Sequence, residues 1–290
     1  MKVLTIIVSY NFEPWIHKCI PSLLDSSYPT DILVVDNASK DNTINIIKAQ
    51  YPSIILIESK ENLGFGKANN VGIKYAIDKG YDYIYLVNQD AWLDRDCIRN
   101  LLMSNAPIKA MLSPVHFDGT EKELDRGFAT YCQHINFNRD IAKVDFVNAA
   151  FWFIPVEIIK NIGSFSPIFY HYGEDKDFTN RLQYHHIEIY VVLNARGYHD
   201  RQDRVESSGV NSKGEFVFHL TELCNINYNW PEALTESILA TYLKAGKYFL
   251  KGNIEASKEY IRIASKLWNK IGEVKETRKK NKTIGSYSNT

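Results

Sequence analysis

The chain has few of the features that mark several large classes of protein. Its four cysteines, Cys19, Cys97, Cys132 and Cys224, lie far apart, so no zinc ribbon or thioredoxin-like pair is predicted and reduced, mostly buried thiols are expected. Lys and Arg together number 34, as do Asp and Glu, so the net charge gives no argument for nucleic-acid binding. No apolar run approaches the roughly 18 residues of a membrane span. The partners must therefore be inferred from local features.

The amino terminus also lacks the marks of a secretion signal. Its apolar stretch is short and reaches Ser9 without a small-residue cleavage site, so a cytoplasmic protein is expected. The 290 residues, of which 45% are apolar, suit one large domain or one domain with an extension.

Short apolar runs alternate with helical patterns along the first hundred residues. Strands are predicted near 3–9, 32–36, 54–58 and 83–87. Helices are predicted near 14–26, from Asp41 as an N-cap, and near 66–79. Because right-handed crossovers join parallel strands, this order predicts the start of a doubly wound α/β sheet.

A polar or glycine-containing segment follows each predicted strand. These segments are 9–11, 36–39, 62–66 and 88–90. Since parallel strands end on one edge of a sheet, all four segments should converge on one crevice. Asp90 would stand at that edge, where a carboxylate can hold a divalent cation against a diphosphate. The pattern favours chemistry on a nucleotide-activated substrate.

These segments also carry a family resemblance. The series 6–11, 34–39, 61–66 and 88–90 resembles the amino-terminal half of family-2 glycosyltransferases with a GT-A fold, and is most similar to the rhamnosyltransferase-like branch. A second block, 169–178 with Arg181-Leu182 and 195–199, looks like the acceptor-side motif and later histidine of that branch. The resemblance spans about residues 3–200. It implies a mixed GT-A sheet flanked by helices, with a nucleotide-sugar half near 1–105 and an acceptor half near 106–213.

The resemblance implies a nucleotide site on the first half. Asp36 would accept a hydrogen bond from the imino N–H of uracil or thymine, with Ser9 and Tyr10 lining the same pocket. The alternative is that Asp36 caps a turn through the backbone of Ala38 or Ser39. The other residues assigned to the nucleotide are Asn11, Asn62, Gly64, Asn88 and Arg204.

The resemblance also implies a Mn²⁺ or Mg²⁺ site at Asp90 and His199. Asn88 departs from the acidic Asp-x-Asp form of the family motif, so metal affinity should depend on Asp90 and on the phosphates of the substrate. The alternatives are that Asp90 caps a helix from about Asp94 and that His199 is a packing residue. Arg201 and Arg204 would either clamp the leaving diphosphate or remain solvated charges.

Asp175, with Glu174 beside it, matches the catalytic pair of the family. The resemblance implies that Asp175 deprotonates the acceptor hydroxyl as the sugar is transferred with inversion. The alternative is that Glu174, Asp175 and Asp177 favour the positive end of a helix dipole. The aromatic residues before them, Phe169, Tyr170 and Tyr172, suit either sugar stacking or a core.

The sequence patterns in the middle and at the end of the chain are less specific than the motifs above. Asp118-Gly119 predicts a hairpin turn, and the alternation over 144–148 predicts a strand that leads into 149–153. From 214 to 274 the pattern is helical, with Gly252-Asn253 as a break, and 275–290 is predicted as a polar basic tail. The mixed apolar and basic stretch 260–270 suits either a membrane surface or packing on the domain or a dimer partner.

The predicted function is a metal-dependent, inverting glycosyltransferase of cell-surface polysaccharide synthesis. It would use a UDP- or dTDP-sugar donor and a glycan or lipid-linked acceptor, with no nucleic acid. It would be cytoplasmic, with peripheral contact to the inner face of the membrane left open. The first alternative is a non-catalytic glycan-binding or scaffolding module. A sugar-1-phosphate nucleotidyltransferase is the second, although 9–13 contains no glycine-rich loop.

Overall fold

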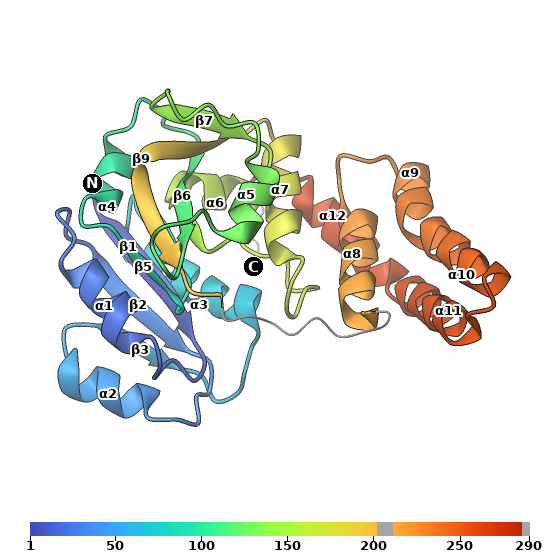
Figure 1. Ribbon diagram of the computed structural model, residues 1–290, viewed down its shortest axis with the longest axis horizontal. Coiled ribbons are helices and arrows are strands. Elements are labelled where there is room, and N and C mark those ends of the chain that lie inside the picture. Colours follow the sequence, from blue (N-terminus) through green and yellow to red (C-terminus); the bar gives the residue numbers. More distant parts are fainter. Residues whose placement is uncertain (202–210, 286–290) are drawn as a thin grey trace.

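A computed structural model of the chain describes residues 1–201 and 211–285. Its centre is a nine-stranded mixed sheet with helices on both faces (Figure 1). The strands are β1 (Val3–Ser9), β2 (Asp31–Asp36), β3 (Ile55–Glu58), β4 (Tyr83–Val87), β5 (Ala91–Leu93), β6 (Met111–Asp118), β7 (Ile141–Val144), β8 (Phe151–Pro155) and β9 (Ile189–His199). Their order is β3-β2-β1-β4-β8-β6-β9-β5, and β7 pairs with β9.

The first four strands are parallel and carry the predicted crossovers. The helices of this half are α1 (Ile16–Leu24), α2 (Thr43–Gln50), α3 (Phe65–Asp78) and α4 (Cys97–Leu102). The expected mixed α/β sheet flanked by helices is confirmed. The predicted cap of α2 is displaced by one residue, because Asn42 takes the N-cap position while the Asp41 carboxylate accepts from Thr43 N at 3.1 Å.

Alternation along the strands creates two cores. Leu4 and Ile6 face one side of the sheet, where α3 and the helices α6 (Val156–Ile162) and α7 (Glu174–Tyr184) pack. Val3 and Ile7 face the other side, covered by α1, α2 and α4. Successive strand residues point to opposite faces, so nearly continuous apolar runs are what a sheet covered on both sides requires.

The second half departs from the predicted pattern before β8. Residues 144–148 do not form the predicted strand, because β7 ends at Val144 and β8 begins at Phe151. The buried Trp152 donates from Nε1 to the Val147 carbonyl at 3.0 Å, which holds the intervening segment as a turn. In addition, β9 runs to His199 and ends on the same edge as the loops of the first half, with α5 (Arg126–Tyr131) nearby.

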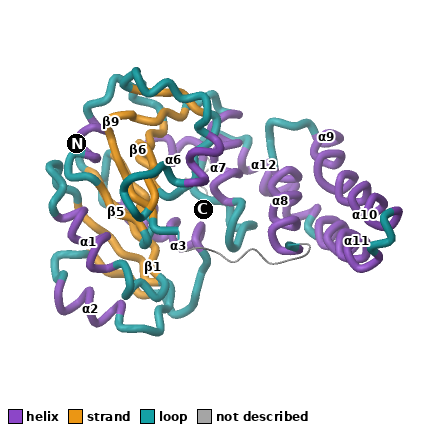
Figure 2. Tube along the Cα trace, in the orientation of Figure 1, coloured by secondary structure: helices purple, strands orange, loops and turns teal. Residues whose placement is uncertain are grey.

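The carboxyl-terminal helices extend from the sheet domain as an arm (Figure 2). They are α8 (Ser212–Cys224), α9 (Trp230–Leu234), the π-helical η1 (Thr235–Leu239), α10 (Ala240–Leu250), α11 (Ile254–Asn269) and α12 (Ile271–Asn281). The predicted break falls between α10 and α11, where Gly252 adopts φ +74°. Tyr260, Ile263 and Leu267 of α11 are buried in the core of the arm, so this face of the 260–270 stretch packs within the protein.

The predicted basic tail from residue 275 is instead a packed helix as far as Asn281. Arg278 of α12 is buried and donates to the carbonyls of Leu223, Asn225 and Tyr228, which belong to the end of α8 and the loop after it. Val274 has no exposed surface. The many charged residues after residue 275 suggested a solvated tail. The hydrogen bonds of the Arg278 guanidinium instead hold this segment against the end of α8. Within 1–201 and 211–285, no helix is both long and apolar enough to cross a membrane.

Candidate functional site

The loops at the carboxyl ends of the parallel strands are bonded to one another. Tyr10, after β1, donates from its backbone N–H to Gln89 Oε1 at 2.7 Å, and Gln89 Nε2 donates to the Tyr10 carbonyl at 3.2 Å. Asn11 adopts φ +52° and accepts from Lys40 N at 2.9 Å. The predicted convergence of these segments on one edge is therefore present in the structure.

A second set of bonds joins the loops after β2 and β3. Asn37 Nδ2 donates to Asn62 Oδ1 at 2.9 Å, and Asn37 Oδ1 accepts from Leu63 N at 2.7 Å. Asn62 also accepts from Gly64 N, so its side chain shapes the turn into α3. These amides hold the loops in place before any ligand arrives, which lowers the ordering cost of binding.

Asp36 lies under these loops with no exposed surface. Parallel pairing places it opposite Ser9, whose Oγ donates to Asp36 Oδ1 at 3.0 Å. Ser39 donates to the same carboxylate from its backbone N–H at 2.9 Å and from Oγ at 2.5 Å. This is the turn-capping arrangement that the sequence left as an alternative. Ser9 and Asp36 therefore support the neighbouring loop from below.

Asp90 and His199 meet at the end of β9. The antiparallel pairing of β5 with β9 sets Ala91 opposite His199 and leaves His199 Nε2 3.3 Å from Asp90 Oδ1. Asn88 Nδ2 lies 3.5 Å from the same ring nitrogen. His199 is buried, whereas the Asp90 side chain is 23% exposed toward the crevice. Because α4 begins at Cys97 after Asp96, Asp90 does not cap that helix.

A buried acid that carried no sequence motif completes this corner. Asp125 Oδ2 lies 2.8 Å from Arg201 Nε and 3.9 Å from His199 Nδ1. Its other oxygen accepts from Phe128 N at 2.9 Å and caps α5. Arg201 thus belongs to an ion pair with a buried partner. The N-cap pattern of Asp before a helical turn was the only sequence signal for Asp125.

The two acids of the predicted catalytic pair, at the start of α7, differ in their exposure to solvent. Glu174 is buried against α3, and its Oε2 has no hydrogen-bond partner among the described residues. Desolvation raises its pKa to about 7. Asp175 is partly exposed and accepts from Lys176 N at 2.7 Å. Burial raises its pKa, against the opposing effects of nearby Lys176 and Arg201. Of the two carboxylates, Asp175 is therefore the more accessible.

Asp177, the third acid of the cluster, is structural. Its carboxylate lies 3.2 Å from Arg181 Nε and accepts from Ser166 Oγ at 2.6 Å and from Asn281 Nδ2 at 3.2 Å. These bonds join α7 to α12 in a fully buried setting. A buried charge with satisfied partners of this kind positions elements rather than reacting.

A cavity of about 390 Å³ opens where the strand-end loops meet the block before α7. Its lining includes predicted site residues from the loops after β1, β3 and β4. It also includes residues that were not predicted as site residues, namely Val8, Asn37, Phe65, Gln89, His171 and Lys213. Of the aromatic block, Tyr170 lines the cavity and donates from its hydroxyl to the Asn62 carbonyl, whereas Phe169 is buried in the core of the arm. Arg204 lies outside the described residues. Asp175 does not line this cavity.

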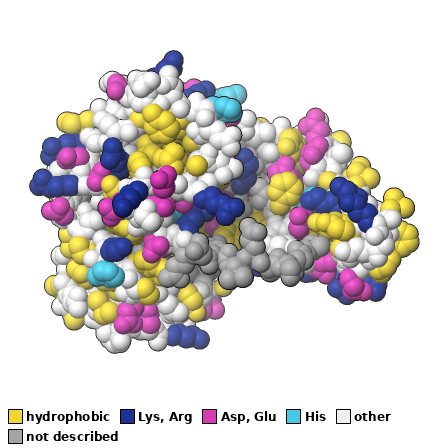
Figure 3. Space-filling view, viewed as in Figure 1, with side chains coloured by type: hydrophobic (Ala, Val, Ile, Leu, Met, Phe, Trp, Pro, Cys, Tyr) yellow, Lys and Arg dark blue, Asp and Glu magenta, His cyan; other side chains and the backbone are white. Residues whose placement is uncertain are grey.

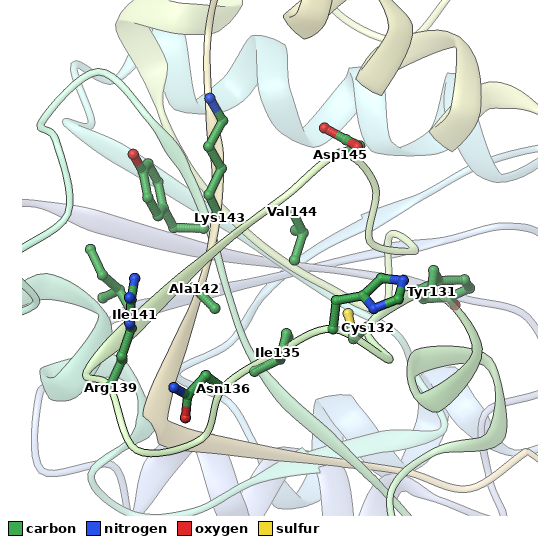
Figure 4. Close-up of a pocket in the computed structure, with 12 residues that line it drawn as sticks. Tyr131, Cys132, Ile135, Asn136, Arg139, Ile141, Ala142, Lys143, Val144 and Asp145 are labelled. Atoms are coloured by element: carbon green, nitrogen blue, oxygen red, sulfur yellow. The ribbon is translucent and has the colours of Figure 1, made fainter.

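A larger cavity of about 670 Å³ lies between β7 and the segment after α5 (Figure 4). Figure 4 shows Ile135, Ala142 and Val144 around it, with Asn136, Arg139 and Asp145 at its rim. Tyr131 lines this cavity, and the pKa of its phenol is raised to about 12, chiefly by burial. The charges of Asp125 and Asp175 add to this increase, and Arg201 opposes it. Tyr131 thus connects this cavity to Asp175 and Arg201.

The donor atoms at the Asp90 corner suit a hard or borderline divalent cation. A carboxylate oxygen, an imidazole nitrogen and the nearby Asn88 amide are ligands that Mn²⁺ accepts. In the part of the chain that the structure describes, no group of three or more His, Cys, Asp or Glu side chains could hold a metal ion. The residues therefore fit a cation that takes its remaining ligands from a bound diphosphate, as Mg²⁺ commonly does.

Comparisons with known proteins agree with this geometry. The profile of the family described as Glycosyl transferase family 2 matches residues 5–154. A poly(ribitol-phosphate) beta-glucosyltransferase of Bacillus spizizenii is 32% identical over 105 residues, which are 34% of this chain and 16% of that protein. An undecaprenyl-phosphate mannosyltransferase of Micrococcus luteus is 35% identical over 94 residues, 31% of this chain and 38% of that protein. The matches thus span less than half the length of these curated relatives.

Solved structures share the fold over nearly the whole chain. S. aureus TarS 1-349 in complex with UDP-GlcNAc has a TM-score of 0.60 at 17% identity, covering 97% of this chain and 89% of that one. The mannosyltransferase PcManGT of Pyrobaculum calidifontis, in complex with GDP-Man and Mn²⁺, has a TM-score of 0.57 at 15% identity, covering 97% and 86%. At these identities the likeness is one of fold.

Proposed function

Because the chain belongs to glycosyl transferase family 2, we propose that it is an inverting glycosyltransferase of cell-surface polysaccharide synthesis. It transfers a sugar from a UDP- or dTDP-sugar to a hydroxyl of a glycan or lipid-linked acceptor. The rhamnosyltransferase-like branch belongs to the proposal and rests on the sequence motifs alone. An acceptor of this class is supported by two relatives, the poly(ribitol-phosphate) beta-glucosyltransferase and the undecaprenyl-phosphate mannosyltransferase.

The observation that carries the proposal is the meeting of Asp90 and His199 beside the 390 Å³ cavity. Two residues from distant parts of the chain are brought to 3.3 Å by the pairing of β5 with β9. The cavity beside these two residues is lined by loops, and hydrogen bonds between the loops fix their positions before a ligand binds. Backbone and amide donors around such a cavity suit a nucleoside diphosphate.

Asp90 and His199, with the Asn88 amide near them, would hold Mn²⁺ or Mg²⁺. When bound, the cation neutralises charge on the leaving diphosphate. Lys213, which stands on the first turn of α8 and lines the cavity, adds a positive charge from this chain. The exposed Tyr10 and the buried Asn37 line the same cavity, and a base bound there would rest above the capped Asp36 turn.

Asp175 acts as the base on the acceptor side. Its carboxylate takes the proton of the acceptor hydroxyl as that oxygen bonds to the anomeric carbon and the bond to the diphosphate breaks. A raised pKa improves a carboxylate as a proton acceptor, and burial supplies that increase at Asp175. One displacement by one nucleophile inverts the anomeric centre. The cavity that Tyr131 lines (Figure 4) would receive the acceptor, since Tyr131 is close enough to Asp175 for the charge of Asp175 to influence the pKa of its phenol.

Donor turnover separates this proposal from a non-catalytic glycan-binding module. We expect the purified chain to release nucleoside diphosphate from one of a set of UDP- and dTDP-sugars. Asp175→Asn should lower that rate about 100-fold or more. The same change at the exposed Asp25, which lies in a salt bridge on the surface, should leave the rate unaltered. Tight donor binding without turnover in the unaltered protein would favour the binding module.

A further inference from the structure

The outward face of α10 carries an apolar stripe that the described residues leave open to solvent. Leu243 is 67% exposed and Leu250 is 86% exposed. The stripe recurs at helical spacing through Leu239, Tyr242, Leu243, Gly246 and Leu250. Beside Gly246, where nothing stands within 4 Å of an added Cβ, it is hollowed by an open space of about 500 Å³. Contiguous exposed apolar side chains of this kind mark interaction surfaces.

The stripe is separate from the face that stabilises the arm. Ser237, Thr241 and Ala245 are buried on the other side of the same helical segment, toward α8 and α11. A helix that only packed on the arm would need one apolar face and would carry polar residues opposite. The second apolar face is therefore left uncovered by the described residues.

The exposed apolar surface continues around the turn into α11. Phe249 is 61% exposed and Ile254 is 43% exposed, on either side of the turn. Figure 3 shows hydrophobic side chains gathered with Lys and Arg at the outer end of the arm. The surface is thus at an extremity, where it can approach a large flat partner.

Lysines flank the middle of this surface, and the exposed acids Glu236 and Glu255 lie at its two ends. The exposed Lys247 and Lys251 flank the stripe, and α10 contains no Asp or Glu. The nearest preceding acids are Glu232 and Glu236, and Glu232 is engaged in the capping box of α9. Across residues 1–201 and 211–285, neither lysine takes part in an ion pair. An apolar stripe with lysines at its border is the arrangement of helices that lie in a membrane interface.

We propose that this α10 surface docks on a membrane that contains anionic lipid. Leu243, Phe249 and Leu250 enter the headgroup boundary while Lys247 and Lys251 contact lipid phosphates. A second copy of the chain is the less favourable occupant, because a two-fold interface would set these lysines against one another without an acid on α10 to pair them. The stretch 260–270, for which the sequence left membrane contact and packing both open, buries Tyr260, Ile263 and Leu267 within the arm. The proposal does not depend on the catalytic assignment.

Flotation of the full chain with lipid vesicles tests this directly. We expect binding to vesicles of equimolar phosphatidylglycerol and phosphatidylcholine, and weaker binding to phosphatidylcholine alone. Replacing Lys247 or Lys251 with Gln should lower partitioning about fivefold for each lysine. The double variant Leu243→Ser, Leu250→Ser should lower it about tenfold or more, because both apolar contacts are lost.

Matched controls stand on the sheet domain. Met103 and Ile108 are 79% and 82% exposed, so Met103→Ser, Ile108→Ser removes comparable apolar surface and should not alter partitioning. Circular dichroism checks that each variant keeps its helices. Absence of binding to either vesicle, or equal binding by the leucine variant and the unaltered chain, would overturn the proposal. A concentration-dependent dimer in sedimentation velocity that Leu250→Ser dissolves would also overturn it, in favour of a second copy.

Discussion

Gly64 lies against the backbone of Tyr170, so closely that a Cβ on Gly64 would stand 2.0 Å from the Tyr170 carbonyl oxygen. Gly64 precedes α3 in the first half of the sheet domain, and Tyr170 belongs to the block before Glu174. Both line the 390 Å³ cavity. The two motif regions therefore meet at one backbone contact, which sets the spacing of the proposed donor site.

Gly64→Ala should destabilise the protein and weaken nucleotide binding. Gly64 has φ +78°, so alanine would meet both backbone strain and a clash with main-chain atoms, at a cost of about 2 kcal/mol or more. Gly80 is the matched control, since it has φ +68° but nothing within 4 Å of an added Cβ, and Gly80→Ala should cost about 1 kcal/mol. Urea unfolding measures both. Equal losses would show that the Tyr170 contact has no energetic role.

Glu174→Gln should remove a pH dependence from the stability. The folded-state pKa of about 7 lies above the ordinary value of 4.5, so the folded protein binds this proton more tightly than the unfolded chain does. The cost of burying the ionised carboxylate is therefore absent below about pH 4.5, grows as pH rises, and is complete above pH 7. Its full size is about 3 kcal/mol.

Urea unfolding of both proteins between pH 5 and pH 8 gives the comparison. The Gln variant should gain stability relative to the unaltered chain as pH rises through this range, because its amide does not ionise. The control Glu255→Gln, at a side chain that is 81% exposed, should show a constant difference. A parallel pH dependence in the Glu174→Gln and unaltered proteins would contradict the assignment.

Arg278→Ala should destabilise the chain far more than the same change one residue later. The Arg278 guanidinium satisfies the carbonyls of Leu223, Asn225 and Tyr228, and its loss leaves buried acceptors without a donor, at about 2–4 kcal/mol. Lys279 is exposed, so Lys279→Ala should change the free energy of unfolding by less than about 0.5 kcal/mol. If both variants changed the free energy of unfolding by the same small amount, the segment would behave as a solvated tail and the packing of Arg278 would be contradicted.

Local pattern predicted the first half of the fold well. The short apolar runs around Ile6 and Ile84 predicted the parallel strands, because a strand buried on both faces is apolar at nearly every position. The end of each strand then placed Tyr10, Asn62 and Asp90 on one edge. Those positions follow from sheet topology and are readable from sequence.

Residues that depend on tertiary partners were not predictable in this way. Asp125 stands in a region without a motif, and only the folded chain shows that it lies beside Arg201 and His199. The basic residues around Arg278 likewise suggested a solvated tail, because a sequence does not show which carbonyls a guanidinium will meet. For Asp36 the sequence left open both a nucleotide contact and a turn cap, and only the folded chain shows that its carboxylate accepts hydrogen bonds from Ser9 and Ser39.

The most direct test of the account is calorimetric titration of the unaltered chain with UDP, dTDP and GDP, with and without Mn²⁺, beside the variants Asp90→Ala and Asp96→Ala. We expect Mn²⁺ to tighten the binding of one nucleotide, Asp90→Ala to abolish that gain, and Asp96→Ala, at an exposed residue before α4, to retain it. Absence of nucleotide binding under every condition, or binding that neither Mn²⁺ nor Asp90→Ala alters, would contradict the proposed donor site.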